Sequence, residues 1–129
     1  MRLANIGYFL RIPLNIFLDE AQNFDFSEGS TLWTILNESR KLNLRMLLSA
    51  PSVVSTMHKD MNVITQCGTQ LYFSPLNSER DKIAEMIDPS DTERQMFALS
   101  RLNKVECIAC GNFIINEKEV SSPIMLQAE

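Results

Sequence analysis

The chain alternates between short apolar runs and stretches in which apolar residues recur at every third or fourth position. Continuous apolar runs are typical of buried β-strands, and the three-to-four-residue spacing is typical of helices. The first clear run, in the sequence IPLNIFLDE over residues 12–20, ends abruptly at the adjacent acids Asp19 and Glu20. We therefore expect a buried strand here, with two carboxylates at its C-terminal end.

The same alternation continues to the end of the chain. Residues 30–88 are expected to form helix-strand units: a serine-capped helix over 30–42, a strand over 44–49, a helix over 53–64, a strand over 69–73 and a helix over 78–88. A further helix is expected over 91–100. A β-hairpin is expected over 104–116, with its turn at Gly111 and Asn112. Strands that alternate with helices favour a parallel α/β sheet flanked by helices. We expect residues 1–129 to form a single domain of this class with a C-terminal β-hairpin.

Length and composition narrow the class of protein. With 129 residues, 45% of them hydrophobic and 22% charged, the chain has the composition of one soluble globular domain. No apolar run approaches the roughly 20 residues needed to cross a bilayer, and three cysteines are too few for a disulfide scaffold. We expect a cytoplasmic protein without a membrane partner. The net charge of −4 gives no general attraction to nucleic acid, so any DNA contact would come from a local patch or an assembly.

The acids at the end of the first strand carry the clearest candidate chemistry. An apolar strand that ends in Asp19 and Glu20 has the form of a Walker B motif. Ligands of open α/β sheets bind at the carboxyl ends of the strands. One acid would hold Mg²⁺, usually through water, and the other would polarise the water that attacks the γ-phosphate. The alternative is a plain junction between a strand and a loop.

A Cys-x-x-Cys pair, Cys107 and Cys110, is a second feature with chemical potential. Positions three apart on a strand point to opposite faces, so the two sulfurs would not share a metal ion. We expect small strand residues here rather than half of a zinc site. The single histidine, His58, is expected on the surface of the helix over 53–64, and its neighbours do not suggest a nucleophilic triad.

The order of three stretches resembles the second half of the HerA and FtsK-like P-loop ATPases. These stretches are DEAQNF, then NESRKLNLRMLLSA, then VITQCGTQLYFSPLNSERDKIAEMI. The resemblance covers the chain from about Ile12 to the closing hairpin, and it depends most on SRK at 39–41 and QCGT at 66–69. The HerA branch of helicases and translocases is the most similar, and the type IV secretion coupling ATPases share the same core.

The resemblance implies a fold, cofactors and partners. The fold would be a P-loop NTPase-like parallel sheet flanked by helices, and the cofactors would be ATP and Mg²⁺. Asp19 would hold the metal, and Asp19 and Glu20 would together face the nucleotide. In a hexameric ring of identical subunits that moves DNA, Arg40 would reach a neighbour's nucleotide and stabilise transition-state charge. The alternative for Arg40 is a cation that complements the dipole at the end of its helix.

The sequence also departs from that family. A phosphate-binding loop of the form GxxxxGK[ST] is absent, because none of the glycines (Gly7, Gly29, Gly68, Gly111) precedes a Lys-Ser or Lys-Thr pair. In the family this loop comes before the Walker B strand, so the chain resembles the C-terminal half of an ATPase domain without its first strand and P-loop. The segment SAP at 49–51 stands where the family carries a glutamine that senses the γ-phosphate. We expect no catalysis unless another chain supplies the P-loop half.

Two other interpretations compete with a partial ATPase domain. A non-catalytic protein-interaction module derived from the same fold is favoured by the missing loop and glutamine, whereas the retained acids and Arg40 favour the ATPase. A flavodoxin-like domain requires a neutral or basic anion-binding loop after the first strand, and FDFSEGST at 24–31 is acidic. Because a sheet that ends at the Walker B strand leaves an apolar edge, we also expect self-association or a covering partner segment.

Overall fold

The computed structural model describes residues 14–39, 41, 43–58, 61–120 and 123–127. These residues fall into two compact units, and the boundary in the chain lies between Gln66 and Cys67. Each unit has its own strands and its own buried side chains. Within the described residues, no helix is long and apolar enough to cross a membrane.

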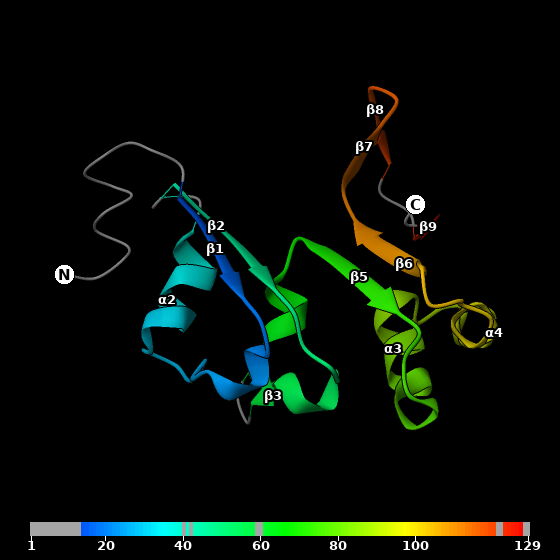
Figure 1. Ribbon diagram of the computed structural model, residues 1–129, viewed down its shortest axis with the longest axis horizontal. Coiled ribbons are helices and arrows are strands. Elements are labelled where there is room, and N and C mark those ends of the chain that lie inside the picture. The colour runs from blue at the N-terminus through cyan, green and yellow to red at the C-terminus, as the bar shows by residue number, and fades with distance from the viewer. Residues whose placement is uncertain (1–13, 40, 42, 59–60, 121–122, 128–129) are drawn as a thin grey trace. The chain divides into compact units, whose positions relative to one another are not determined.

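The first unit is built on two parallel strands joined by a helix. The elements are β1 (Leu14–Leu18), α2 (Thr31–Glu38) and β2 (Leu44–Leu48), and the two strands pair in register along their whole length. The helix runs beside the strand pair in Figure 1. It begins at Ser30, whose side chain accepts a hydrogen bond of 3.1 Å from the backbone N–H of Trp33. This is the N-terminal cap that a serine provides to an otherwise unpaired amide.

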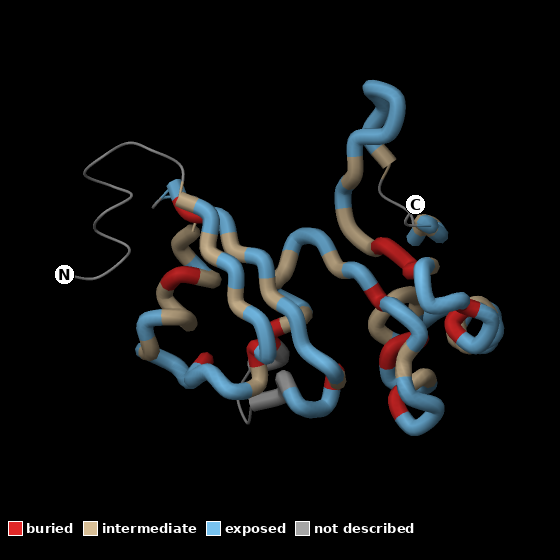
Figure 2. Tube along the Cα trace, viewed as in Figure 1, coloured by how far each residue is buried: buried red, intermediate tan, exposed pale blue. Residues whose placement is uncertain are grey.

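The core of the first unit lies on one face of the strand pair. Along β1 and β2 exposed residues alternate with less exposed ones, which Figure 2 shows as alternating blue and tan. The side chains that pack together are Ala21, Phe26 and Val63, with Leu18, Leu32, Leu36 and Leu48 against them. The alternation therefore leaves the opposite face of the two strands in contact with solvent.

The helix expected over 53–64 is wrong. The chain forms η2 (Val54–Thr56), β3 (Met57–His58), β4 (Met61–Asn62) and η3 (Val63–Gln66), in which the two short strands pair antiparallel. Another short 3₁₀ helix, η1 (Ala21–Asn23), follows β1. The apolar spacing in this stretch fits a helix, but β-branched residues are frequent in it, and these restrict the side-chain rotamers that a helix allows. His58 consequently lies on a strand rather than on a helix.

The second unit combines a three-stranded antiparallel sheet with two helices. Its elements are β5 (Thr69–Phe73), η4 (Asn77–Glu79), α3 (Arg80–Ile87), α4 (Thr92–Ser100), β6 (Glu106–Gly111), β7 (Phe113–Ile115), β8 (Lys118–Val120) and β9 (Ile124–Gln127). The sheet order is β5-β6-β9, and α3 packs against α4. The buried hydrophobic residues come from the sheet, from both helices and from the segment after α4; they are Tyr72, Ile83, Ala84, Leu99, Leu102, Cys107, Ile108 and Ala109.

One glycine in the second unit is required by its surroundings. Gly111 ends β6 opposite Thr69, with a φ of 116° in the left-handed half of conformational space. A Cβ added at Gly111 would collide with the backbone carbonyl oxygen of Gly68. Only glycine combines this backbone conformation with so close an approach of two chain segments.

The expected parallel sheet flanked by helices is also wrong, and with it the P-loop NTPase-like architecture. Among the described residues only β1 and β2 pair in parallel, whereas the sheet of β5, β6 and β9 and the short ladders are antiparallel. The sequence led to this error because an apolar run predicts a strand but says nothing of its direction. Two helices between β5 and β6 return the chain antiparallel here.

The expected C-terminal hairpin pairs differently from the prediction. The run over 105–110 does not pair with the run over 113–115; β6 instead lies between β5 and β9. The hairpin forms one step later, between β7 and β8, and turns at Asn116 and Glu117 with φ of 49° and 65°. Positive φ at both turn residues is typical of the tight turns that match the twist of a hairpin.

Candidate functional site

The two parallel strands of the first unit are held together beyond their last paired residues. The backbone N–H of Ser49 donates to the carbonyl oxygen of Leu18 at 2.9 Å, and the carbonyl of Ser49 accepts from the N–H of Ala21 at 2.8 Å. The backbone of Ser49 is thus hydrogen-bonded both to the last residue of β1 and to the turn that follows β1. This pairing fixes the C-terminal ends of the two strands side by side, where the sequence places its acids.

Asp19 lies next to Ser49 at this position. Its Oδ1 atom accepts a hydrogen bond from the Ser49 hydroxyl and another, of 3.0 Å, from the backbone N–H of Glu20. Both bonds orient the carboxylate, and bonds to a charged acceptor are stronger than those between neutral groups. Because both end on Oδ1, Oδ2 is the oxygen through which Asp19 would meet a ligand.

Glu20 adopts a backbone conformation that is unusual for its residue type. Its φ of 55° and ψ of 51° place it in the left-handed helical region. A non-glycine residue is uncommon there, and such conformations concentrate at functional sites. Its carboxylate accepts a hydrogen bond of 2.7 Å from the side-chain amide of Gln22. The sharp bend therefore turns Glu20 out of the line of β1 while its side chain stays tied to the next turn.

Gln22 contributes an unsatisfied oxygen to the same place. Its Oε1 atom is buried and has no hydrogen-bond partner among the described residues. Exchanging the amide's oxygen and nitrogen would set an oxygen against the Glu20 carboxylate, so the present orientation is the better one. Leaving a buried acceptor unpaired costs about 1–3 kcal/mol. A water molecule or a bound donor would remove that cost.

These groups fit a hard cation only in part. Carboxylate oxygens suit Mg²⁺, which is commonly held by one or two carboxylates together with water and phosphate oxygens. Asp19 and Glu20 are both exposed. Within the described residues, no cluster of three or more His, Cys, Asp or Glu side chains could hold a metal. Any cation at Asp19 would therefore take most of its ligands from water or from a phosphate.

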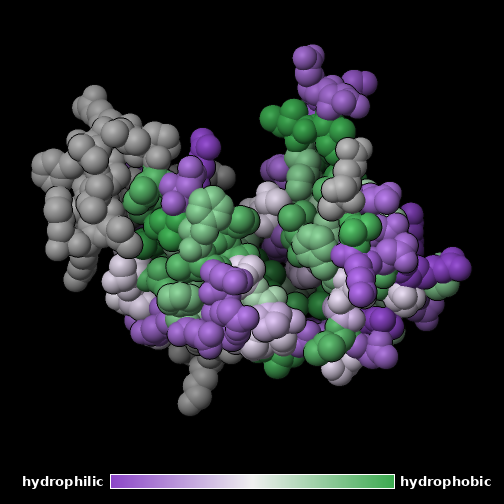
Figure 3. Space-filling model, in the orientation of Figure 1, coloured by the Kyte–Doolittle hydropathy of each residue, from purple (hydrophilic) through white to green (hydrophobic). Residues whose placement is uncertain are grey.

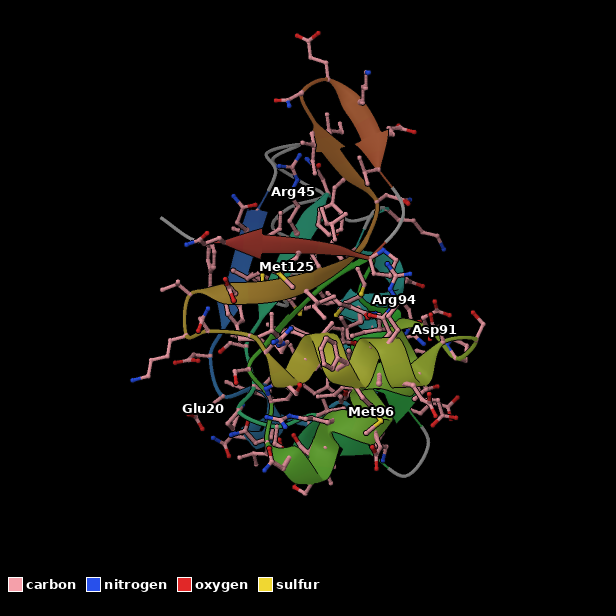
Figure 4. All side chains as sticks on the ribbon, turned by 90° about the vertical axis from the view of Figure 1, so that its right-hand side faces the viewer. Glu20, Arg45, Asp91, Arg94, Met96 and Met125 are labelled. Carbon is pink, nitrogen blue, oxygen red and sulfur yellow. The ribbon has the colours of Figure 1, made fainter. Side chains whose placement is uncertain are left out.

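The positive groups expected around a nucleotide are not assembled by the described residues of this unit. Arg40 lies outside the described residues. Arg45 lies near the start of β2, and Figure 4 shows it toward the opposite end of the strand pair from Glu20. Because charge interactions weaken with distance and salt, Arg45 contributes little to binding a phosphate at the acids.

The cysteines of the second unit are free thiols, of which Cys107 is buried and Cys67 and Cys110 are half-buried. Burial raises the pKa of Cys67, of Cys107 and of Cys110, so each stays protonated near neutral pH. Cys110 pairs with Gln70 across the sheet, whereas Cys107 pairs with Phe73. Since the thiolate is the metal ligand and the nucleophile, these thiols are poorly suited to either role.

A tyrosine shares the environment of these thiols. The hydroxyl of Tyr72 donates a hydrogen bond of 2.8 Å to the side-chain oxygen of Gln70. The side-chain nitrogen of Gln70 in turn donates to the carbonyl oxygen of Cys67 at 3.3 Å. Burial first, and then the nearby Cys110 and Cys67, raise the pKa of Tyr72 well above its usual range. The group is therefore a neutral part of the core.

The structure brings Asp19 and Glu20 together with two residues that sequence reasoning did not assign to the site. Ser49 was considered only as a replacement for a missing glutamine, and Gln22 was not considered. The sequence held one usable signal, since a hydroxyl that follows the second of two adjacent parallel strands lies beside the acid that follows the first. No model of a known protein family matches the chain, and a search of curated proteins finds none that is similar to it.

Proposed function

We propose that the chain supplies the acidic part of the ATP site in a HerA/FtsK-like ATPase that moves DNA. In this proposal Asp19 holds Mg²⁺ and Glu20 orients the attacking water. The phosphate-binding loop lies outside these 129 residues, on another chain or another segment. DNA is engaged by the assembly, because the chain itself has a net charge of −4.

One observation carries the proposal. The side chain of Asp19 bonds to Ser49 across the carboxyl ends of two parallel strands, beside Glu20 in a left-handed conformation. This is where α/β proteins bind their ligands, and an oriented carboxylate there is suited to a hydrated cation. A plain junction between strand and loop does not require the bond from the Ser49 hydroxyl to Asp19.

The residues present do not complete a catalytic site. ATP hydrolysis depends mainly on positioning and charge stabilisation of the transferred phosphoryl group. The sequence has no Walker A loop to cradle the phosphates. The chain alone is therefore inactive, and its contribution is a metal-binding acid and a water-orienting acid.

Paramagnetic broadening by Mn²⁺, used in place of Mg²⁺, tests the proposal without a partner. In NMR spectra of the whole chain, the amides of Asp19, Glu20 and Ser49 should broaden first as Mn²⁺ is added. Asp19→Asn should remove that broadening, whereas Asp81→Asn, which alters an exposed acid of α3, should leave it unchanged. Calorimetry should give no binding of Mg²⁺-ATP to the chain alone. Uniform broadening at all exposed acids would refute the proposal.

A non-catalytic interaction module is the second candidate. Two large apolar side chains at paired positions on β1 and β2 favour it, since Phe17 is 71% exposed and Leu47 is 60% exposed. Exposed apolar side chains gathered on one face typically mark an interaction site. If Mn²⁺ does not broaden the amides around Asp19 before others, the interaction module is the function that we propose for the chain.

A further inference from the structure

One face of the β1–β2 pair is exposed along its whole length. The side chains on this face follow the two-residue period of a strand, and the three pairs are Asn15 with Arg45, Phe17 with Leu47, and Asp19 with Ser49. All six residues are exposed. Parallel sheets are usually covered on both faces, because the connections between their strands place helices there. Within the described residues of the first unit, nothing covers this face of the strand pair.

The chemistry of the face changes along the strands in an ordered way. Phe17 and Leu47 form an apolar centre on this face. Figure 3 shows hydrophobic residues in the region of β1 and β2. Arg45 lies at one end of this centre, and Asp19 lies at the other. Along the strands, the position of Arg45 is four residues from that of Asp19, which corresponds to about 13 Å at 3.3 Å per residue. The two charges are thus too far apart to pair within one molecule.

From this pattern we infer that the face binds the same face of a second copy of this chain. The two copies pack face to face and are related by a two-fold axis that lies between them. This axis runs perpendicular to the strands at the level of Phe17 and Leu47, so it brings the two apolar centres together. The same rotation places Arg45 of each copy over the Asp19 end of the other. Two-fold interfaces require such a self-complementary patch. An axis along the strands would instead bring the two Arg45 residues to the same end of the interface, away from Asp19, so the charge pattern selects the first arrangement.

The small area of the face limits the affinity of the proposed dimer. Five residues of each of two strands cover about 16 Å by 10 Å. A stable interface buries about 800 Å² on each partner, which is several times more. The expected complex is a reversible dimer of low affinity. Since its charges lie at the rim, high salt should weaken it further.

Sedimentation equilibrium of the whole chain, in buffer with EDTA and without nucleotide, tests the inference independently of the proposed function. The wild type should dimerise reversibly over a concentration series up to about 500 μM, as expected of a small interface. Leu47→Ser should raise the dissociation constant roughly tenfold or more, because it removes half of the apolar centre. Ile114→Ser, which alters a more exposed apolar side chain on β7, should not change the dissociation constant. A monomer throughout the series would overturn the inference.

Charge reversal tests the arrangement itself. Arg45→Asp would set two acids against each other in a homodimer, and Asp19→Arg would set two cations against each other. Each variant alone should stay monomeric, whereas an equimolar mixture should form a heterodimer at least as tightly as the wild type. Circular dichroism checks that both variants are folded. Failure of the mixture to associate would contradict the antiparallel pairing, even if each variant is monomeric.

Discussion

The residue that best connects local conformation to function is Glu20. It holds a left-handed backbone conformation between β1 and η1, although it has a Cβ and a long side chain. A residue in such a conformation costs of order 1 kcal/mol relative to one that adopts it freely. Glycine and asparagine adopt this conformation with less strain, yet Glu117 in the β7–β8 turn is also left-handed. The role proposed for Glu20 therefore depends on its position beside Asp19, and not on its φ alone.

Replacing Glu20 by glycine should stabilise the chain while removing the acid. We expect the free energy of unfolding to rise by about 0.5–1 kcal/mol, because glycine adopts positive φ without strain. Urea denaturation followed by circular dichroism measures this change. Glu20→Ala is the matched control, since it loses the carboxylate but keeps the Cβ. Equal stability of the two variants would show that backbone strain is not what distinguishes Glu20.

At the scale of elements, the short helices depend on their caps. α2 and α4 contain only two to three turns, and isolated helices of this length are unstable in water. Ser30 caps α2, and Asp91 caps α4 by accepting from the N–H of Arg94 at 3.3 Å. Figure 4 shows Asp91 and Arg94 near one end of α4.

Loss of the serine cap should weaken the first unit. Ser30→Ala leaves the N–H of Trp33 without its acceptor and should lower the free energy of unfolding by about 1 kcal/mol. Trp33 is the only tryptophan, so its fluorescence reports on this unit during urea titration. Ser30→Asp, which restores an acceptor, should recover most of the loss. An unchanged midpoint in Ser30→Ala would mean that packing alone holds the start of α2.

The connection between α3 and α4 should make stability depend on pH. The Ser90 hydroxyl and backbone N–H donate to Asp88 at 2.6 and 3.0 Å, and these bonds lower the pKa of Asp88 from its ordinary value of 3.8. Because the folded-state pKa is the lower one, the contribution to stability is complete well above pH 3.8 and is lost as the pH falls through the folded pKa.

Comparison with an uncharged side chain isolates this contribution. The wild type should exceed Asp88→Asn in melting temperature at pH 6, and the difference should shrink as the pH is lowered below 4. Differential scanning calorimetry at a series of pH values gives the two curves. Since both hydrogen bonds from Ser90 to Asp88 lie at the exposed surface, the difference should be small at every pH. Parallel curves over the whole range would contradict the assignment.

At the scale of the whole molecule, the buried side chains form separate cores in two units. The second unit, residues 67–129, contains a three-stranded sheet, two helices and fully buried Leu99 and Ala109. Domains of about 60 residues fold alone in many cases, although they are marginally stable. The division at Gln66 and Cys67 therefore predicts that one half can fold without the other.

Residues 67–129 expressed alone should unfold cooperatively on heating. The expected signal is a single sigmoidal loss of helical circular dichroism, because α3 packs against α4 and the helices and the sheet all contribute buried side chains. Leu99→Ala in the same fragment should cost about 2–5 kcal/mol and abolish the transition, since Leu99 is 0% exposed. A fragment without helical signal would show that the second unit depends on the first.

The amino-acid sequence by itself determined where most elements lie. The strands at 44–48 and 69–73, the serine-capped helix after Ser30 and the helix that begins after Asp91 were predicted near their observed bounds. Local features decide these positions, because periodicity, capping residues and proline act within one or two turns. The abrupt end of β1 at Asp19 and Glu20 was likewise visible as a change from apolar to acidic residues.

Only the tertiary structure decided how the strands pair and which faces they bury. Direction and neighbours depend on contacts between distant segments, so the sequence could not tell a parallel sheet from the antiparallel order β5-β6-β9. The mainly apolar run of β1 predicts a buried strand, yet Phe17 is 71% exposed. The bond from Ser49 to Asp19 follows from the pairing of β1 with β2, which no local pattern contains. The chemistry of the candidate site was therefore present in the sequence, while its assembly arose from the fold.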